Sequence, residues 1–255
     1  MLREHLAQKS LGAKEYFRWR GGEVSRIEGF TDAVFAFAIT LLVVSLEVPR
    51  SFDELVETMK GFAAFGVTFT ALLGIWYAHY LFFRRYGMQD GFTFVLNAVL
   101  LFVILFYIYP LKFLFTLLIS YGLLERVLGF EFRGEIAIQG QQWEPLMVIY
   151  GLGFLAVFLV FVLLHWHAYR KRHELALNPV EIITTRSSIS AYGICVLIAL
   201  LSIGIVAFGG SYRAAISGWL YALIGPLQAL NGIIFGRQIQ KLQKDSSITA
   251  AFAGQ

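Results

Sequence analysis

The chain has 255 residues, of which 58% are hydrophobic and 15% are charged, and its mean hydropathy is +0.66. A soluble domain of this length would be far more polar, so the composition excludes a soluble protein and indicates a polytopic membrane protein. The net charge of +4 does not indicate nucleic-acid binding, because the basic residues flank apolar stretches instead of forming a run.

The N-terminal 25 residues are charged and mixed, without an apolar core, so no cleavable signal is expected. After them, six stretches reach the roughly 20 apolar residues that a helix needs to cross a bilayer. We therefore predict an all-α integral membrane protein whose residues 1–255 form a single domain of six transmembrane helices. The predicted spans are 30–48, 61–83, 92–119, 146–168, 188–208 and 214–235.

Lysine and arginine are distributed unequally between the loops that join these spans. Most of the 21 basic residues lie in the N-terminal segment, at Arg84 and Arg85, in the segment 170–186 and after residue 236. The remaining loops are rich in acidic residues. The positive-inside rule therefore predicts that both termini are cytoplasmic, in the inner or plasma membrane of a cell.

The first span begins with Arg26, Glu28, Thr31 and Asp32, an unusual density of polar groups for a membrane helix. Successive helical residues are about 100° apart, so Arg26 and Asp32 point about 120° away from each other and cannot form an i,i+4 pair. A charge at the centre of a membrane helix costs roughly 2.5–3.5 kcal/mol. These side chains therefore require partners on other helices or in another subunit.

Suitable partners occur on the next two spans. Trp76 and His79 are three residues apart and share one helix face, and Asn97 lies in an apolar stretch of the third span. Such side chains form hydrogen bonds between membrane helices. We predict a structural polar network, for which scaffolding is the simpler role and titration or gating the alternative. Its members are Arg26, Thr31, Asp32, Trp76, His79 and Asn97.

An apolar stripe follows the charged start of the first span. Ala33, Phe37, Leu41 and Val44 are spaced i, i+4, i+8 and i+11, and Thr40 lies beside them. Such a stripe is more often core or lipid-facing than pore-lining. The periodicity alone leaves all three positions open.

Three motifs occur in order on the first three spans. R-x-x-x-F-T-D is formed by Arg26, Phe30, Thr31 and Asp32; W-x-x-H-x-x-F by Trp76, His79 and Phe82; and N-x-x-x-L-F…P by Asn97, Leu101, Phe102 and Pro110, followed by Leu111 where an aromatic residue would complete the third motif. Together they resemble the signature of the lysosomal and bacterial transmembrane potassium channels, a non-canonical tetrameric family without the usual pore loop. Threonine replaces the family's usual serine at Thr31, and the motifs cover the first half of the chain.

The resemblance implies a homotetrameric, potassium-permeable channel of the six-span bacterial type, with no enzyme activity and no cofactor. Four copies of the first helix would line the pore for potassium and other monovalent cations. The narrowest layer would fall at Phe37, followed by Leu41 and Val44, with Thr40 as the hydroxyl position. Phe37 is bulkier than the usual isoleucine or leucine, so this constriction would conduct only when its rings rotate aside. Apolar rings of this kind gate by dewetting.

Two other classes of protein remain open. A proton-coupled secondary transporter would use Asp32 and His79 as its titrating pair. A membrane enzyme would need a nucleophile or metal ligands, but no nucleophile elbow, catalytic carboxylate pair or phosphate-binding loop appears. His165 and His167 are two residues apart and point to nearly opposite sides of a helix, so no metal site is predicted. The segment 148–154, VIYGLGF, lacks the order of a potassium filter, so no re-entrant pore loop is expected.

Overall fold

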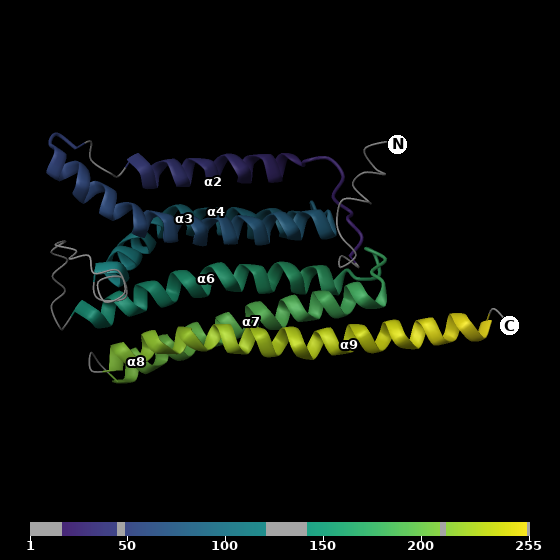
Figure 1. Cartoon of the computed structure of the whole chain (residues 1–255). Helices are drawn as coiled ribbons and strands as arrows, with labels where there is room; N and C mark the ends of the chain where they lie inside the picture. The colour runs from purple at the N-terminus through teal and green to yellow at the C-terminus, as the bar shows by residue number, and fades with distance from the viewer. Residues whose placement is uncertain (1–16, 45–48, 121–141, 210–212, 254–255) are drawn as a thin grey trace.

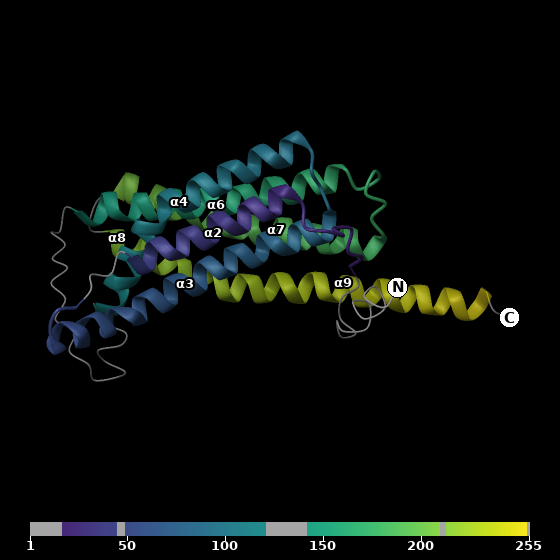
Figure 2. The same ribbon diagram turned by 90° about the horizontal axis from the view of Figure 1, so that it is seen from above.

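The computed structural model describes residues 17–44, 49–120, 142–209 and 213–253, and all of its regular structure is helical. Figure 1 shows the long helices running along a common direction, with α2 on one side of the bundle and α9 on the opposite side. Figure 2 shows that α9 extends past the other helices at its C-terminal end. The elements are α2 (Arg26–Val44), α3 (Phe52–Tyr86), α4 (Gly91–Ser120), α6 (Trp143–Arg170), α7 (Pro179–Gly209), α8 (Ala214–Trp219), the 3₁₀ helix η3 (Leu220–Leu223) and α9 (Ile224–Ala253).

Within the described residues, five helices are long and apolar enough to cross a membrane. The candidate spans are Ala64–Tyr86, Gly91–Leu117, Trp143–Arg170, Pro179–Gly209 and Ile216–Lys244. α2, with 19 residues and its cluster of charges, is not among them. The all-α membrane architecture predicted from the sequence is confirmed, whereas the sixth crossing and the side of the termini stay predictions. Residues 121–141, between α4 and α6, lie outside the described residues.

α3 is longer than the span predicted at 61–83, because its start depends on a cap and not on hydropathy. Ser51 Oγ accepts a hydrogen bond from the Glu54 amide at 3.1 Å, and acidic residues occupy the first turn, where the helix dipole favours them. At the other end Gly87, with φ 61°, donates its N–H to the Phe83 carbonyl at 2.8 Å. The 35 residues of α3 extend about 52 Å, more than the roughly 30 Å hydrocarbon core.

α7 also begins earlier than the predicted boundary at 188. Asn178 Oδ1 accepts from the Glu181 amide at 2.8 Å, and Glu181 Oε2 accepts from the Asn178 amide at 2.9 Å. This reciprocal cap starts the helix at Pro179, a residue suited to a first helical turn. A polar helical extension therefore precedes the apolar part of the span.

The predicted last span, 214–235, is divided into α8, η3 and α9. Pro226 lies in the first turn of α9 and has no backbone N–H. The carbonyl of Ala222 consequently has no i+4 donor, which favours the tighter 3₁₀ turn observed there. Hydropathy does not detect this interruption.

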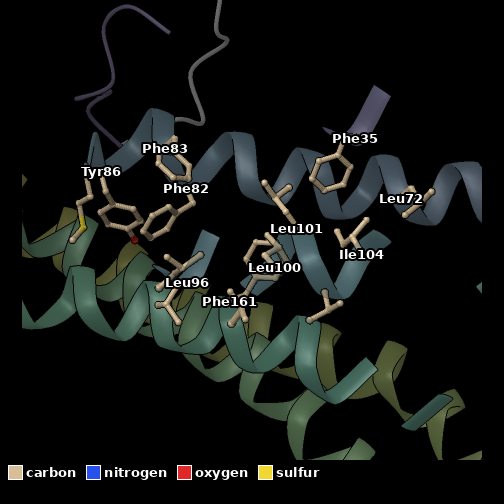
Figure 3. Close-up of a cluster of buried hydrophobic side chains, with 14 of the residues drawn as sticks. Phe35, Leu72, Phe82, Phe83, Tyr86, Leu96, Leu100, Leu101, Ile104 and Phe161 are labelled. Carbon is tan, nitrogen blue, oxygen red and sulfur yellow. The ribbon is translucent and has the colours of Figure 1, made fainter. Parts of the chain in front are cut away.

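The core lies between α3, α4 and α6, and three residues of α2 contribute to it: Phe35, Ala38 and Leu42. Figure 3 shows side chains from these helices packed against one another. Lipid tails are as apolar as the surfaces of membrane helices, so the hydrophobic effect does little to bring these helices together. Close van der Waals packing of this kind holds them together instead. The labelled residues, each at most 7% exposed, are Phe35, Leu72, Phe82, Phe83, Tyr86, Leu96, Leu100, Leu101, Ile104 and Phe161.

Candidate functional site

One face of α2 is fixed against the bundle. Thr31, Phe35, Ala38 and Leu42 recur at helical spacing, and each is at most 2% exposed. α2 packs against α3 and α4. This buried stripe was not predicted from the sequence, although its spacing of three and four residues is visible there.

Another face of α2 is open. Phe30 is 64% exposed and Phe37 is 57% exposed. Thr40 is exposed and Leu41 is half-buried, while the side chain of Val44 lies outside the described residues. The described part of the predicted apolar stripe is therefore directed mainly away from the chain's own core, toward lipid or another subunit.

Thr31, His79 and Asn97 form a buried chain of hydrogen bonds across α2, α3 and α4. Asn97 Nδ2 donates to Thr31 Oγ1 at 2.9 Å, and Thr31 Oγ1 donates to the Ile27 carbonyl at 2.8 Å. Asn97 Oδ1 lies 2.8 Å from His79 Nε2. Because an amide oxygen only accepts, Nε2 carries the proton in neutral His79. The three side chains are at most 3% exposed, so their polar groups satisfy one another inside an apolar bundle.

Asp32 and Trp76 form a separate contact closer to the surface. Trp76 Nε1 donates to Asp32 Oδ1 at 2.7 Å. Asp32 is exposed and Trp76 is half-buried. The six predicted network residues thus include two hydrogen-bonded sets, which meet at the neighbouring positions Thr31 and Asp32.

Arg26 joins neither set within the described residues, and its side chain is exposed. Its position about 120° around the helix from Asp32 explains the separation. The place of Arg26 in the network, with a partner on another helix or in another subunit, stays a prediction. Glu28 has a local role instead: its carboxylate accepts from the Ser25 amide at 2.8 Å, and Ser25 Oγ accepts from the Glu28 amide at 3.2 Å. This capping box starts α2.

A charged cluster that was not predicted from the sequence lies where α4 begins and α6 ends. Asp90 Oδ2 lies 2.8 Å from His167 Nε2 and 3.0 Å from Lys171 Nζ, and Asp90 Oδ1 accepts from the Thr93 amide at 2.9 Å. Burial favours a higher pKa for Asp90, but these hydrogen bonds outweigh it and hold the pKa well below its usual range. The only sequence signal was an aspartate three residues before Thr93, a common helix-capping pattern.

In the described part of the chain, no group of three His, Cys, Asp or Glu side chains is placed to hold a metal ion. His165 and His167 have different neighbours. The ring of His165 packs edge-on against Phe82 with centroids 5.2 Å apart, whereas His167 contacts Asp90. These histidines therefore serve helix packing and a hydrogen bond to Asp90 at the end of the bundle.

Comparison with known proteins gives consistent matches. Residues 26–107, which hold α2, α3 and most of α4, match the family described as endosomal/lysosomal potassium channel TMEM175. A protein of Marivirga tractuosa named potassium channel is 41% identical over 239 residues, covering 92% of this chain and 97% of its own length. Potassium channel Cha6605_3372 of Chamaesiphon minutus is 35% identical over 98 residues, covering 34% of this chain and 47% of its own length. The crystal structure of a variant of the potassium channel MtTMEM175, bound to a nanobody–MBP fusion, has a TM-score of 0.78 and 40% identity over 91% of this chain and 100% of that chain.

The helical bundle and its polar-anchored first helix define a multi-pass membrane protein of the ion-channel class. The chain belongs to the TMEM175 family of potassium channels, as the motifs on its first three helices predicted. Its relatives are named as channels and not as enzymes.

Proposed function

We propose that four copies of this chain form a potassium-permeable cation channel in a cell membrane, with α2 lining the pore. The observation that supports this most directly is the division of α2 into two faces. Phe35 is 2% exposed and anchors the helix, while Phe37, two positions on, is 57% exposed. A helix that is packed on one face and exposed on another can line a symmetry axis where several copies of the chain meet. The likeness to named potassium channels supports potassium as the permeant ion.

The proposed constriction consists of rings of Phe37, Leu41 and Val44, with Thr40 as the hydroxyl layer. Apolar rings close by dewetting, and when wider they pass a cation that has lost part of its hydration shell. The Thr40 hydroxyl donates its proton to the Ala36 carbonyl at 2.9 Å. Its oxygen lone pairs are therefore free to replace water around a passing monovalent cation. Selectivity arising in this way is modest.

The proposed topology is a single six-span domain in the cell membrane, with both termini cytoplasmic. The 19 residues of α2 extend about 28 Å, close to the roughly 30 Å hydrocarbon core. The basic residues Arg20, Arg84, Arg85 and Lys171 gather at the end of the bundle where α2 begins, as hydrogen bonds between their segments show. The positive-inside rule places this end in the cytoplasm.

A proton-coupled transporter would require proton exchange between Asp32 and His79. The two residues are hydrogen-bonded to different partners, Trp76 and Asn97. Each partner gives its residue a structural role, which favours the channel over the carrier.

The test is potassium and sodium flux into vesicles that contain the purified protein. Phe37→Ser removes the proposed apolar ring and should raise potassium flux while weakening discrimination against sodium. Phe106→Ser is the matched control, because Phe106 on α4 is 71% exposed and lies outside the proposed pore helix. Equal flux and equal discrimination in the two variants would contradict the assignment of Phe37 to the pore.

A further inference from the structure

Residues 17–22, here called the strap, cross the end of the bundle where α2 begins. Figure 1 shows this segment running from the start of α2 past the end of α3 toward residues 171–178, which join α6 to α7 and are here called the α6–α7 corner. Phe17 at its beginning is 7% exposed and packs edge-on against Tyr86 with ring centroids 5.3 Å apart. The strap is thus built into the bundle and leads directly into the cap of α2.

The strap is held at the α6–α7 corner by an ion pair between Arg20 and Glu181. Arg20 Nη1 donates to Glu181 Oε1 at 3.0 Å and Nη2 donates to Oε2 at 2.6 Å. The Arg18 amide also donates to Oε1, at 2.7 Å, and the Asn178 amide to Oε2, at 2.9 Å. The Glu181 side chain is fully buried, and that of Arg20 is 15% exposed. Each carboxylate oxygen has two donors, which leaves the pair little freedom to move.

Arg20 also donates hydrogen bonds to backbone carbonyls of the α6–α7 corner. Its Nε donates to the Leu175 carbonyl at 2.8 Å, and its Nη2 donates to the Ala176 carbonyl at 3.2 Å. A planar guanidinium that makes a fork with a carboxylate and further bonds to carbonyls fixes orientation as well as distance. Lysine at this position would keep the charge and lose that geometry.

The strap is attached to α3 at the same place. The amides of Arg20 and Gly21 donate to the Arg84 carbonyl at 3.0 and 3.1 Å, and Arg84 Nη1 donates to the Gly22 carbonyl at 2.7 Å. A Cβ atom on Gly21 would lie 2.7 Å from the Phe83 carbonyl oxygen, whereas one on Gly22 would meet nothing within 4 Å. The close approach of the strap to α3 therefore depends on glycine at position 21.

These contacts connect the segment that leads into α2 with the start of α7, although α2 and α7 each pack chiefly against other helices. α2 packs against α3 and α4, while α7 packs chiefly against α6. We propose that Arg20 and Glu181 are positioning residues of the pore, because their ion pair ties the start of α2 to the α6–α7 corner. This inference rests on the proposed function, in which α2 lines the pore.

The chemistry of the pair favours positioning over simple stabilisation. Removing two charges from water costs free energy that offsets much of their mutual attraction, so a buried ion pair adds little to the free energy of folding. Its hydrogen-bond geometry nevertheless fixes the relative position of the two segments. The α6–α7 corner already has its own cap from Asn178. The additional bonds from the strap serve to place α2.

The test measures two quantities on the full-length protein. Amide hydrogen exchange of residues 17–30 reports the order of the strap and of the first turn of α2. The ratio of potassium to sodium flux in vesicles reports the alignment of the pore, and it does not depend on how much protein folds. The variants are Arg20→Gln, Arg20→Lys and Gly21→Ala, with Arg18→Gln and Gly22→Ala as matched controls. Arg18 is exposed and contributes only backbone groups to the described contacts.

We expect Arg20→Gln to speed exchange through the first turn of α2 and to lower the flux ratio by roughly twofold or more, since modest selectivity depends on ring alignment. Arg20→Lys should lie between this variant and the wild type. Gly21→Ala, which keeps every charge, should reproduce the effect, and both controls should match the wild type. If Arg20→Gln does not fold, the exchange rates and flux ratios of Gly21→Ala and Gly22→Ala are compared instead, and a difference between these two variants supports the positioning role.

Faster exchange with an unchanged flux ratio, in a protein whose ratio responds to Phe37→Ser, would overturn the positioning role. If Phe37→Ser itself leaves the flux ratio unchanged, the assignment of α2 to the pore is contradicted, whereas the proposal that the strap positions α2 is not. Exchange in the first turn of α2 then decides alone whether the ion pair positions this helix. Exchange that is unchanged in both Arg20→Gln and Gly21→Ala would overturn the inference outright.

Discussion

Replacing Asn97 with leucine is expected to be among the most damaging single changes in the polar network. The variant loses the bonds to Thr31 and His79. The bond to Thr31 is worth about 0.6 kcal/mol, the average for hydrogen bonds between membrane helices. Buried His79 is also left without a partner on Nε2, which costs about 1–3 kcal/mol. The sum is about 2–4 kcal/mol, or a fall of about 4–16 °C in the unfolding midpoint for a protein of this size.

The assay is thermal unfolding in one detergent, followed by tryptophan fluorescence, for Asn97→Leu, His79→Phe and the double variant. Most of the cost arises from an orphaned polar group, so removing both partners should cost much less than the sum of the single effects. Asn231→Leu is the matched control: Asn231 is 7% exposed and donates to Ser187 on a different helix pair. Its effect should add to that of His79→Phe. Simple additivity of Asn97→Leu and His79→Phe would show that neither side chain depends on the other for its hydrogen bonds.

Three further predictions follow from the site. Asp32→Asn should weaken tetramer assembly in light scattering, because Arg26 loses a counter-charge across subunits, whereas Asp53→Asn on the exposed start of α3 should not; equal assembly of the two would count against the network. The pKa of Asp90 is lowered on folding, so its stabilisation is present above the unfolded pKa of about 3.9 and is lost as pH falls below that value. Lowering the pH from about 7 to about 3 should therefore reduce the unfolding midpoint of the wild type more than that of Asp90→Asn, and equal reductions would show that the cluster contributes nothing. Cysteines introduced at Glu23 and Phe52 should react with a membrane-impermeant maleimide from opposite sides of the membrane, and labelling from the same side would contradict the proposed topology.

Much of the fold follows from features that a single sequence carries. Apolar length locates the long helices, and the motif residues Asp32, Trp76 and Asn97 indicate which helices touch. Helix ends were located less well, because they depend on local caps. Ser51 and Glu54 at the start of α3 and Asn178 and Glu181 at the start of α7 each form such a cap, and both pairs lie in polar segments that hydropathy assigns to loops.

The part of the site that could not be predicted depends on contacts between distant segments. Arg20 and Glu181 are 161 positions apart, and nothing in either neighbourhood indicates the other. The separation of the network into two hydrogen-bonded sets likewise depends on the rotation of α3, which places His79 inside and Trp76 nearer the surface. Spacing shows which residues share a face, but it does not show which of them is covered.

Electron cryomicroscopy of the full-length protein in lipid nanodiscs would show which helix surrounds the axis of the assembly. We expect a fourfold axis along α2, with Phe37 and Thr40 facing the axis, and with Phe35 and Ala38 turned toward α3 and α4 of the same chain. A map in which Phe37 contacts acyl chains at the rim of the particle, or in which another helix surrounds the axis, would contradict this expectation.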